Sequence, residues 1–164
     1  MIVVSNTTPL LCLYYINHLN LLQELFGKIY VPEAVYNEIT NYGENKPGND
    51  LFHLSNFIIT KKVINKMTVE LLQVNLDYGE SEAVVLAKEL PADILLMDEK
   101  KARRVAQANN ILIMGTLGVL LVAKKRGMVT NVKSLMDDLI NKNIWIEKQL
   151  YHKIICEADE KETT

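Results

Sequence analysis

Residues 94–97 restrict the fold of this chain more than any other stretch, because Ile-Leu-Leu-Met is wholly apolar and stands between two helical patterns. Before it, apolar residues recur at helical spacing from Ala83 to Leu90, and Pro91 ends that pattern. A strand in a parallel sheet typically has such a continuous apolar run, because crossover helices bury both of its faces. We therefore expect a parallel strand here, with Asp98 at its carboxyl end.

The same alternation of short apolar runs and helical patterns extends along the whole chain. It predicts a three-layer α/β/α sandwich with a central, mostly parallel sheet. The expected strands are 2–4 (a candidate central strand), 29–31, 57–60 (at an edge), 94–97 and 111–114. The expected helices are 9–14, 19–26, 33–39, 51–57, 68–76, 78–90, 100–109, 119–126, 132–142 and 148–157.

The length of 164 residues is sufficient for one domain with a full core. We expect this domain over residues 1–157, with a surface loop at 43–50 and a frayed tail at 158–164. The balance of 18 Lys and Arg against 20 Asp and Glu does not by itself demand a nucleic acid or an anionic membrane as partner. Cys12 and Cys156 form no paired motif, so we expect reduced thiols and no zinc site.

The first residues lack the basic segment of a signal peptide, and their apolar run stops at Ser5. The leucine-rich stretch 10–26 is interrupted by polar residues far below transmembrane length. These features predict a soluble, cytoplasmic protein with no membrane contact.

Four positions fall where strand ends and helix starts meet: Asn6, Glu38, Glu82 and Asp98. Ligand sites of open α/β sheets lie at the carboxyl ends of strands. Mg²⁺ or Mn²⁺ prefers oxygen ligands and retains several waters, so a few carboxylates suffice to bind it. The alternatives are that Glu82 only complements the helix dipole and that Asp98 only caps the next helix. We expect Glu33 and Glu80 to be exposed acids in the first turns of their helices.

Five segments together resemble the PIN-domain family, in the branch that reads SDTSPL, IPEAVYEE, GEAEAI, LLLDDRRAR and GTLGVL. The matching segments are SNTTPL from Ser5, VPEAVYNE from Val31, GESEAV from Gly79, LLMDEKKARR from Leu95 and GTLGVL from Gly115. Each segment is weak evidence alone, but five in the right order are fairly specific, and the resemblance extends to about Glu157.

The resemblance implies metal-dependent cleavage of RNA by a Rossmann-like α/β/α sandwich. It also implies frequent membership of toxin–antitoxin pairs, with a small antitoxin as partner and homodimerisation. By position, Asn6 stands for the first metal-binding aspartate, and Glu38, Glu82 and Asp98 for the other three acids. Glu99 is an alternative to Asp98, since the register of the acidic pair is uncertain.

Asn6 departs from the family pattern, because an amide keeps a carbonyl oxygen and loses the negative charge. Two explanations stay open: a naturally weakened nuclease, or an Asp→Asn change introduced to express a toxic enzyme. The alternative function is a catalytically inactive PIN-like module that binds RNA or a protein.

Basic residues follow Asp98 closely in the sequence. One interpretation is that Lys100, Arg103 and Arg104 form a basic rim that binds phosphates beside the acids. A solvated charged face is the competing interpretation. Thr116 could hydrogen-bond a phosphate or a metal-bound water, or simply form a turn. We expect Trp145 to pack the C-terminal segment onto the sheet rather than to stack on a base.

Overall fold

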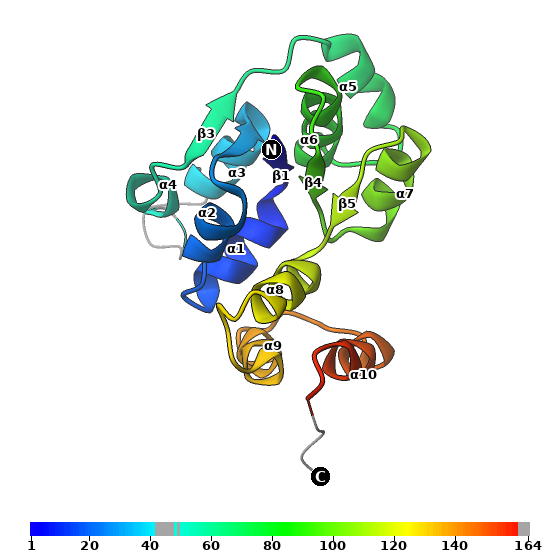
Figure 1. Ribbon diagram of the computed structural model, residues 1–164. Helices are drawn as coiled ribbons and strands as arrows, with labels where there is room; N and C mark the ends of the chain where they lie inside the picture. The colour runs from blue at the N-terminus through cyan, green and yellow to red at the C-terminus, as the bar shows by residue number, and fades with distance from the viewer. Residues whose placement is uncertain (42–47, 49, 161–164) are drawn as a thin grey trace.

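The computed structural model describes residues 1–41, 48 and 50–160. Five parallel strands form its sheet: β1 (Val3–Ser5), β2 (Ile29–Pro32), β3 (Ile58–Lys61), β4 (Ile94–Leu96) and β5 (Ile113–Met114). Their order is β3-β2-β1-β4-β5, so β1 is central and β3 lies at an edge, as expected (Figure 1).

The register of the sheet brings the ends of β1 and β4 together. Ser5 pairs with Leu96, and the Asn6 N–H donates to the Leu96 carbonyl at 3.0 Å. Beyond β4, the Met97 N–H still donates to the Met114 carbonyl at 2.9 Å. The residues that follow β1 and β4 therefore leave the same edge of the sheet side by side.

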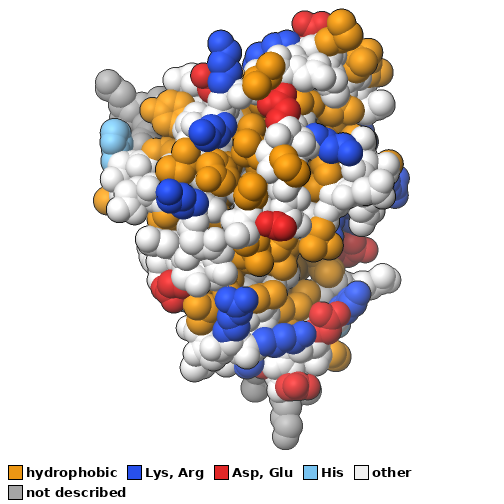
Figure 2. Space-filling view, turned by 45° about the horizontal axis from the view of Figure 1, so that its top comes forward, with side chains coloured by type: hydrophobic (Ala, Val, Ile, Leu, Met, Phe, Trp, Pro, Cys, Tyr) orange, Lys and Arg blue, Asp and Glu red, His pale blue; other side chains and the backbone are white. Residues whose placement is uncertain are grey.

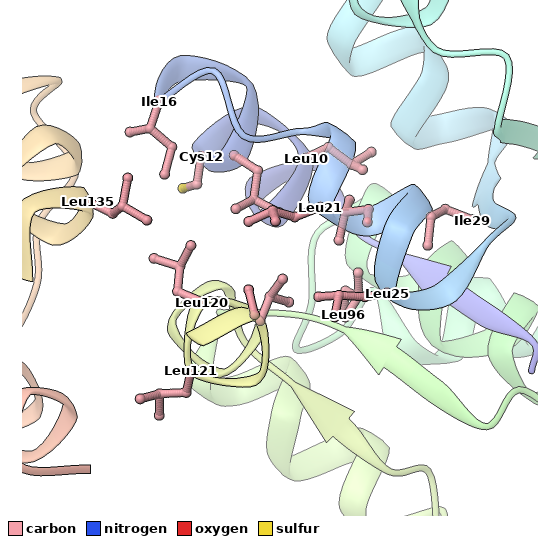
Figure 3. Close-up of a cluster of buried hydrophobic side chains, with 14 of the residues drawn as sticks. Leu10, Cys12, Ile16, Leu21, Leu25, Ile29, Leu96, Leu120, Leu121 and Leu135 are labelled. Carbon is pink, nitrogen blue, oxygen red and sulfur yellow. The ribbon is translucent and has the colours of Figure 1, made fainter. Parts of the chain in front are cut away.

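One face of the sheet is covered by α1 (Thr7–Tyr15), α2 (Asn20–Phe26) and α8 (Thr116–Lys125), with α9 (Val132–Asn141) and α10 (Lys148–Glu157) packed beyond α8 (Figure 1). Leu10, Leu21 and Leu25 meet Leu120 of α8 and Leu96 of the sheet in this core (Figure 3).

The opposite face is covered by α5 (Lys66–Leu72), α6 (Tyr78–Glu89) and α7 (Lys100–Ala108). Val4 and Leu95 point into this second core, whereas their neighbours Val3 and Leu96 point into the first. Alternate residues of a strand face opposite sides, so both faces are buried. This confirms the three-layer sandwich. The helix α3 (Glu33–Thr40) contacts both α1 and α6, and α4 (Leu51–Leu54) is a short helix before β3.

Several expected boundaries were wrong. The fourth helix ends at Leu54 instead of residue 57, and α5 begins at Lys66. Asn65 caps α5 by accepting from the Thr68 N–H at 3.0 Å, so Thr68 is not the cap. The eighth helix begins at Thr116, not at residue 119. Most of the loop expected over 43–50 lies outside the described residues.

The chain beyond α10 is held in place as far as Glu160, where we expected fraying from residue 158. Glu160 accepts from Lys124 at 2.6 Å and from the Val132 and Lys133 N–H groups at 2.7 and 2.8 Å. Ala158 is buried. Among the helices of the described residues, none has the length and apolar character needed to cross a membrane.

Candidate functional site

A pocket of about 1080 Å³ opens at the carboxyl ends of β1 and β4. Sequence-predicted residues that line it are Asn6, Glu38, Asp98, Glu99, Lys100, Arg103 and Thr116. Two more acids, Asp77 and Glu80, line it as well. Glu82 and Arg104 do not belong to this lining.

Asn6 presents an unsatisfied oxygen to this pocket. The residue follows β1 in an extended conformation, and its side chain does not cap α1. It is only 5% exposed, yet none of the described residues donates a hydrogen bond to Oδ1. Buried polar atoms normally have a partner, so this oxygen is available to an ion or a water.

Glu38 comes from the last turn of α3 and lies against the start of α6. Thr7 Oγ1 donates to its Oε2. A Cβ on Gly79 would lie 2.8 Å from the Glu38 carboxyl carbon, so only glycine permits this approach. Burial raises the pKa of the Glu38 carboxyl, and the charge of Asp77 adds to the shift, although hydrogen bonds from Thr7 and the Gly79 N–H oppose it.

Asp98 is fixed by the first residue of α8. Its Oδ1 accepts from the Thr116 N–H at 2.8 Å, and its Oδ2 accepts from Thr116 Oγ1 at 2.5 Å. Gly115 leaves room for this contact, because a Cβ there would lie 2.7 Å from Asp98 Oδ1. Glu99 caps α7 by accepting from the Lys101 N–H at 3.4 Å, so Asp98 is not the cap of that helix.

Glu80, and not Glu82, is the glutamate of α6 that lines the pocket. It forms a capping box with Asp77: the Glu80 N–H donates to Asp77 Oδ1 at 2.7 Å, and the Asp77 N–H donates to Glu80 Oε2 at 3.1 Å. The expectation of an exposed acid was wrong, since Glu80 is 8% exposed. Burial raises the pKa of its carboxyl, and the nearby charges of Asp77, Glu99 and Glu38 add to the shift.

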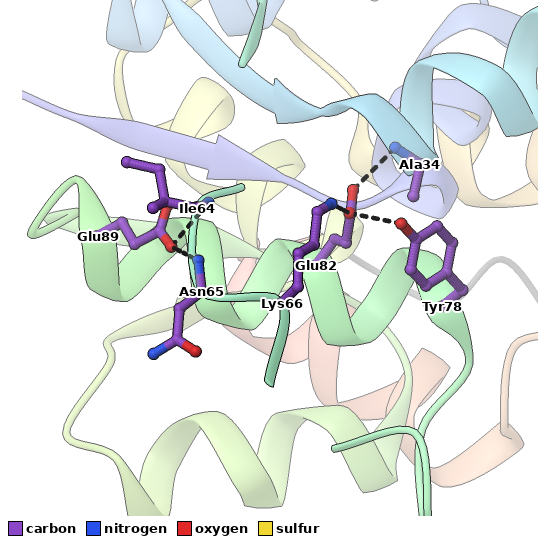
Figure 4. Close-up of polar contacts among 7 residues, drawn as sticks. All are labelled: Ala34, Ile64, Asn65, Lys66, Tyr78, Glu82 and Glu89. Atoms are coloured by element: carbon purple, nitrogen blue, oxygen red, sulfur yellow. Dashed lines mark hydrogen bonds and ion pairs between the residues drawn. The ribbon is translucent and has the colours of Figure 1, made fainter. Parts of the chain in front are cut away.

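Glu82 does not line the pocket. Figure 4 shows its carboxylate bonded to Lys66, Tyr78 and Ala34. Its fully buried carboxylate accepts from Lys66 Nζ at 2.5 Å, Tyr78 OH at 2.8 Å and the Ala34 N–H at 3.0 Å. Burial alone would raise the pKa of Glu82, but these three hydrogen bonds outweigh it and lower the pKa below its ordinary value. The expected convergence of four side chains therefore fails at Glu82.

The capping box was the signal in the sequence that could have identified Glu80. Asp77 is followed three residues later by Glu80, which places Glu80 beside the start of the helix. Glu82 lies two residues further, about 200° around the helix axis, and must face another direction. Its partner Lys66 is 16 residues away, and no local pattern marks that contact.

The oxygen atoms of this pocket match the preference of a hard divalent cation. Within residues 1–41, 48 and 50–160, no three His, Cys, Asp or Glu side chains are grouped tightly enough to enclose an ion by themselves. Mg²⁺ is typically held by one or two carboxylates and keeps several waters. Glu38, Glu80, Asp98 and the unpartnered Asn6 oxygen line the same pocket, and one or two of these carboxylates could bind a cation in that way.

Cys12 also lines the pocket, but it is not a plausible nucleophile. Burial raises the pKa of its thiol to about 12, and the charge of Asp98 acts in the same direction. The thiol therefore keeps its proton at neutral pH, and thiols react mainly as thiolates. Both cysteines of the chain are free, as expected, and Cys156 is exposed.

The basic residues near the pocket divide into two groups. Lys100 and Arg103 line it, and Arg103 Nη1 lies 3.5 Å from the Met97 carbonyl. Arg104 is exposed outside the lining. Figure 2 shows a face on which Lys and Arg side chains are scattered among apolar and acidic ones, without a continuous basic patch.

The comparison with protein families agrees with this geometry. A family model described as a PIN domain matches residues 2–160. No curated protein and no solved structure matches the chain. Since the match covers nearly all 164 residues, the chain belongs to the PIN-domain family, whose members are generally nucleases.

Proposed function

We propose that this protein is an endoribonuclease that depends on Mg²⁺ or Mn²⁺. In this proposal Glu38, Glu80 and Asp98, with the Asn6 amide oxygen, hold the cation. Glu80 replaces Glu82 of the original expectation. The observation that carries the proposal is the buried, unpartnered Asn6 Oδ1 in a pocket that also gathers these acids.

The acids of the pocket are positioned before any substrate arrives. Thr116 fixes Asp98 through two hydrogen bonds, and Thr7 fixes Glu38. Such preorganisation reduces the cost of assembling a site during the reaction. A bound divalent cation supplies charge neutralisation at the scissile phosphate and lowers the pKa of a coordinated water.

The raised pKa values of Glu38 and Glu80 show that these carboxyls are poorly compensated in the pocket. A cation would stabilise their charged forms. Lys100 and Arg103 lie in the same lining and offer positive charge to the phosphates on either side of the cleaved bond. Glu99 is exposed at the pocket and is a candidate partner for a coordinated water.

The biological role belongs to the same proposal and rests on family resemblance. We propose a toxin of a toxin–antitoxin pair, with RNA as substrate, a small antitoxin as partner and a homodimer as the assembled form.

The test compares three chains: the present one, Asn6→Asp and Asp98→Asn. Each is assayed with Mn²⁺ for cleavage of a single-stranded RNA and for the rise of its melting temperature on Mn²⁺ addition. We expect Asn6→Asp to cleave at least about tenfold faster and to show the larger thermal shift, because it regains an anionic ligand. Asp98→Asn should lose both. If Asn6→Asp shows neither cleavage nor a thermal shift, the proposal is wrong.

A second candidate is a catalytically inactive module that binds RNA or a protein, and Asn6 is the observation that favours it. It predicts RNA or protein binding that is independent of Mn²⁺. Cleavage by the present chain in the same assay would exclude this alternative.

A further inference from the structure

Trp145 lies where a packed residue was expected, but it is 80% exposed. It belongs to the connection between α9 and α10 and lines the pocket described above. Its neighbours Ile144 and Ile146 are partly buried and pack against the first hydrophobic core. The connection is thus anchored on both sides of an aromatic side chain that remains in solvent, which corrects the expectation that Trp145 packs on the sheet.

The connection is also tied to the acidic end of the pocket. Glu147 forms an ion pair with Lys100 at 3.0 Å, and Lys100 is the first residue of α7, two positions after Asp98. The Ile144 N–H donates to the Leu139 carbonyl at 3.0 Å. These contacts place Trp145 on the same hollow as the acids.

The pocket wall on the side of α8 and α10 differs in character from the acidic side. It contains the apolar side chains Leu117, Leu121, Leu150 and Ile154. The lining also includes the cations Lys100, Arg103 and Lys153. An exposed aromatic ring, an apolar wall and nearby cations are the features with which proteins bind single-stranded nucleic acid: bases stack, and cations contact the phosphates.

We propose that Trp145 and this apolar wall form a subsite for an unpaired nucleobase next to the acidic end of the pocket. The inference rests on the proposed function, since it places a base of the RNA strand beside the acids that act on its backbone. A base within a duplex has no free face for the ring, so the subsite selects single-stranded RNA. Continuity with the acids, where the backbone of the strand would bind, favours this occupant over a second apolar protein surface, and Arg103 in the same lining can contact a phosphate. Lys100 and Lys153 are paired with Glu147 and Glu157.

Trp145 is the one tryptophan of the sequence, so intrinsic fluorescence reports on this position directly. The test titrates the chain, in chelator and at fixed low salt, with three probes of equal length. The probes are a single-stranded oligoribonucleotide, its abasic analogue and an RNA duplex. We expect saturable quenching by the single strand, and at least fivefold weaker binding of the other two.

A matched pair of truncations completes the experiment. Trp145→Ala should weaken binding of a labelled single strand roughly tenfold, and Trp145→Phe should retain most of the affinity because a ring remains. Ile64→Ala truncates an apolar side chain that is 85% exposed outside the pocket lining and should leave affinity unchanged. Equal melting temperatures confirm that all variants are folded.

The outcomes separate the subsite from the nuclease proposal. Quenching by the single strand, without cleavage by the Asn6→Asp chain after Mn²⁺ addition, supports the subsite and argues against the nuclease. Cleavage that is unaffected in Trp145→Ala, or equal binding of the abasic probe, overturns the subsite. The subsite is also overturned if the Trp145 fluorescence does not change on RNA addition but changes with protein concentration as a dimer forms. The ring would then belong to an interface between copies of the chain.

Discussion

Glu80 and Glu82 are separated by one residue on α6, yet their carboxylates have unrelated partners. Glu80 is bound to Asp77 and lines the acidic pocket. Glu82 is fully buried against Lys66, Tyr78 and the start of α3. Because residues two apart on a helix point about 200° from each other, one acid can serve the pocket while the other joins α6 to α3.

This difference predicts opposite phenotypes for two conservative substitutions. Glu80→Gln should abolish the rise in melting temperature caused by Mn²⁺ and leave the cation-free melting temperature almost unchanged or higher. Glu82→Gln should lower the cation-free melting temperature by several degrees, because charge-assisted hydrogen bonds of this kind contribute roughly 1.5–3 kcal/mol. Thermal melts with and without Mn²⁺ measure both effects. If Glu82→Gln abolished the Mn²⁺-induced rise and Glu80→Gln did not, the results would indicate that Glu82 binds the cation.

Gly79 should be required for the position of Glu38. Gly79→Ala places a Cβ 2.8 Å from the Glu38 carboxyl carbon, so the carboxylate must move and cleavage should fall at least about tenfold. The fold should survive, since alanine favours a helix by about 1 kcal/mol over glycine. Cleavage rates of Gly79→Ala measured in the natural and the Glu38→Asp backgrounds test the cause.

Glu38→Asp shortens the side chain and withdraws the carboxylate from Gly79. If steric overlap is the cause, Gly79→Ala costs much less activity in that background than in the natural one. Equal losses in the two backgrounds would show that Gly79 acts in some other way.

The pH dependence of stability should reflect the uncompensated acids. The pKa of Glu80 is raised above its ordinary value of 4.5, so the folded chain holds this proton at a pH where the unfolded chain has lost it. The free energy of unfolding contributed by Glu80 therefore falls as pH rises from 4.5 through the raised pKa. Glu38 acts in the same direction. Glu80→Gln should thus gain stability relative to the present chain across that window.

Urea unfolding of both chains from pH 4.5 to pH 8 measures this difference, and Mn²⁺ should reduce it by compensating the charge. A difference that is constant with pH would mean that burial and the neighbouring charges do not raise the pKa of Glu80. Glu82 provides an internal contrast. Its pKa is lowered, so its contribution is present above 4.5 and is lost as pH falls through the lowered pKa.

The sequence was sufficient to locate the five strands and to indicate that β1 is central and β3 lies at an edge. The strands Val3–Ser5 and Ile94–Leu96 are short, mostly apolar and buried on both faces, as is typical of strands in a parallel sheet. The proximity of Asn6 and Asp98 could be predicted as well, because they follow β1 and β4 and the carboxyl ends of neighbouring parallel strands share one edge of the sheet.

Positions that depend on contacts distant in sequence could not be predicted in the same way. The capping box distinguishes Glu80 from Glu82 within α6, but Lys66, the ion-pair partner of Glu82, lies 16 residues away and no local pattern predicts that contact. Trp145 was expected in the core because most tryptophans are largely buried. Its two isoleucine neighbours fill that role instead.

Arg103 and Arg104 form a matched pair for the basic rim. Arg103 lines the pocket, whereas its neighbour Arg104 is exposed outside it. Arg103→Ala should weaken binding of single-stranded RNA and reduce the slope of log affinity against log salt by about 0.7, as expected for one lost phosphate contact. Arg104→Ala removes the same charge and should change neither the affinity at fixed salt nor the slope substantially. Filter binding over a salt series measures both quantities. Equal effects of the two substitutions would show that these arginines act only through nonspecific charge and not through a phosphate contact of Arg103.

Glu160 should stabilise the packing of α8 against α9, the helix that precedes Trp145. It accepts from Lys124 on α8 and from the first N–H groups of α9, so it joins two helices while capping one. Loss of a helix cap costs roughly 0.5–2 kcal/mol. Glu160→Gln removes the ion pair with Lys124 and one of the two oxygens that accept from α9. We expect a destabilisation of this order in urea unfolding at neutral pH. Asp159→Asn changes the neighbouring charge as a control and should have little effect.

The pKa of Glu160 is lowered, because hydrogen bonds from Lys124, Lys133 and Val132 outweigh the effect of burial. Its contribution is therefore present above 4.5 and disappears as pH falls through the lowered value, where the two chains should become equally stable. A difference that persists at acid pH would mean that the Glu160 charge is not what holds these helices together.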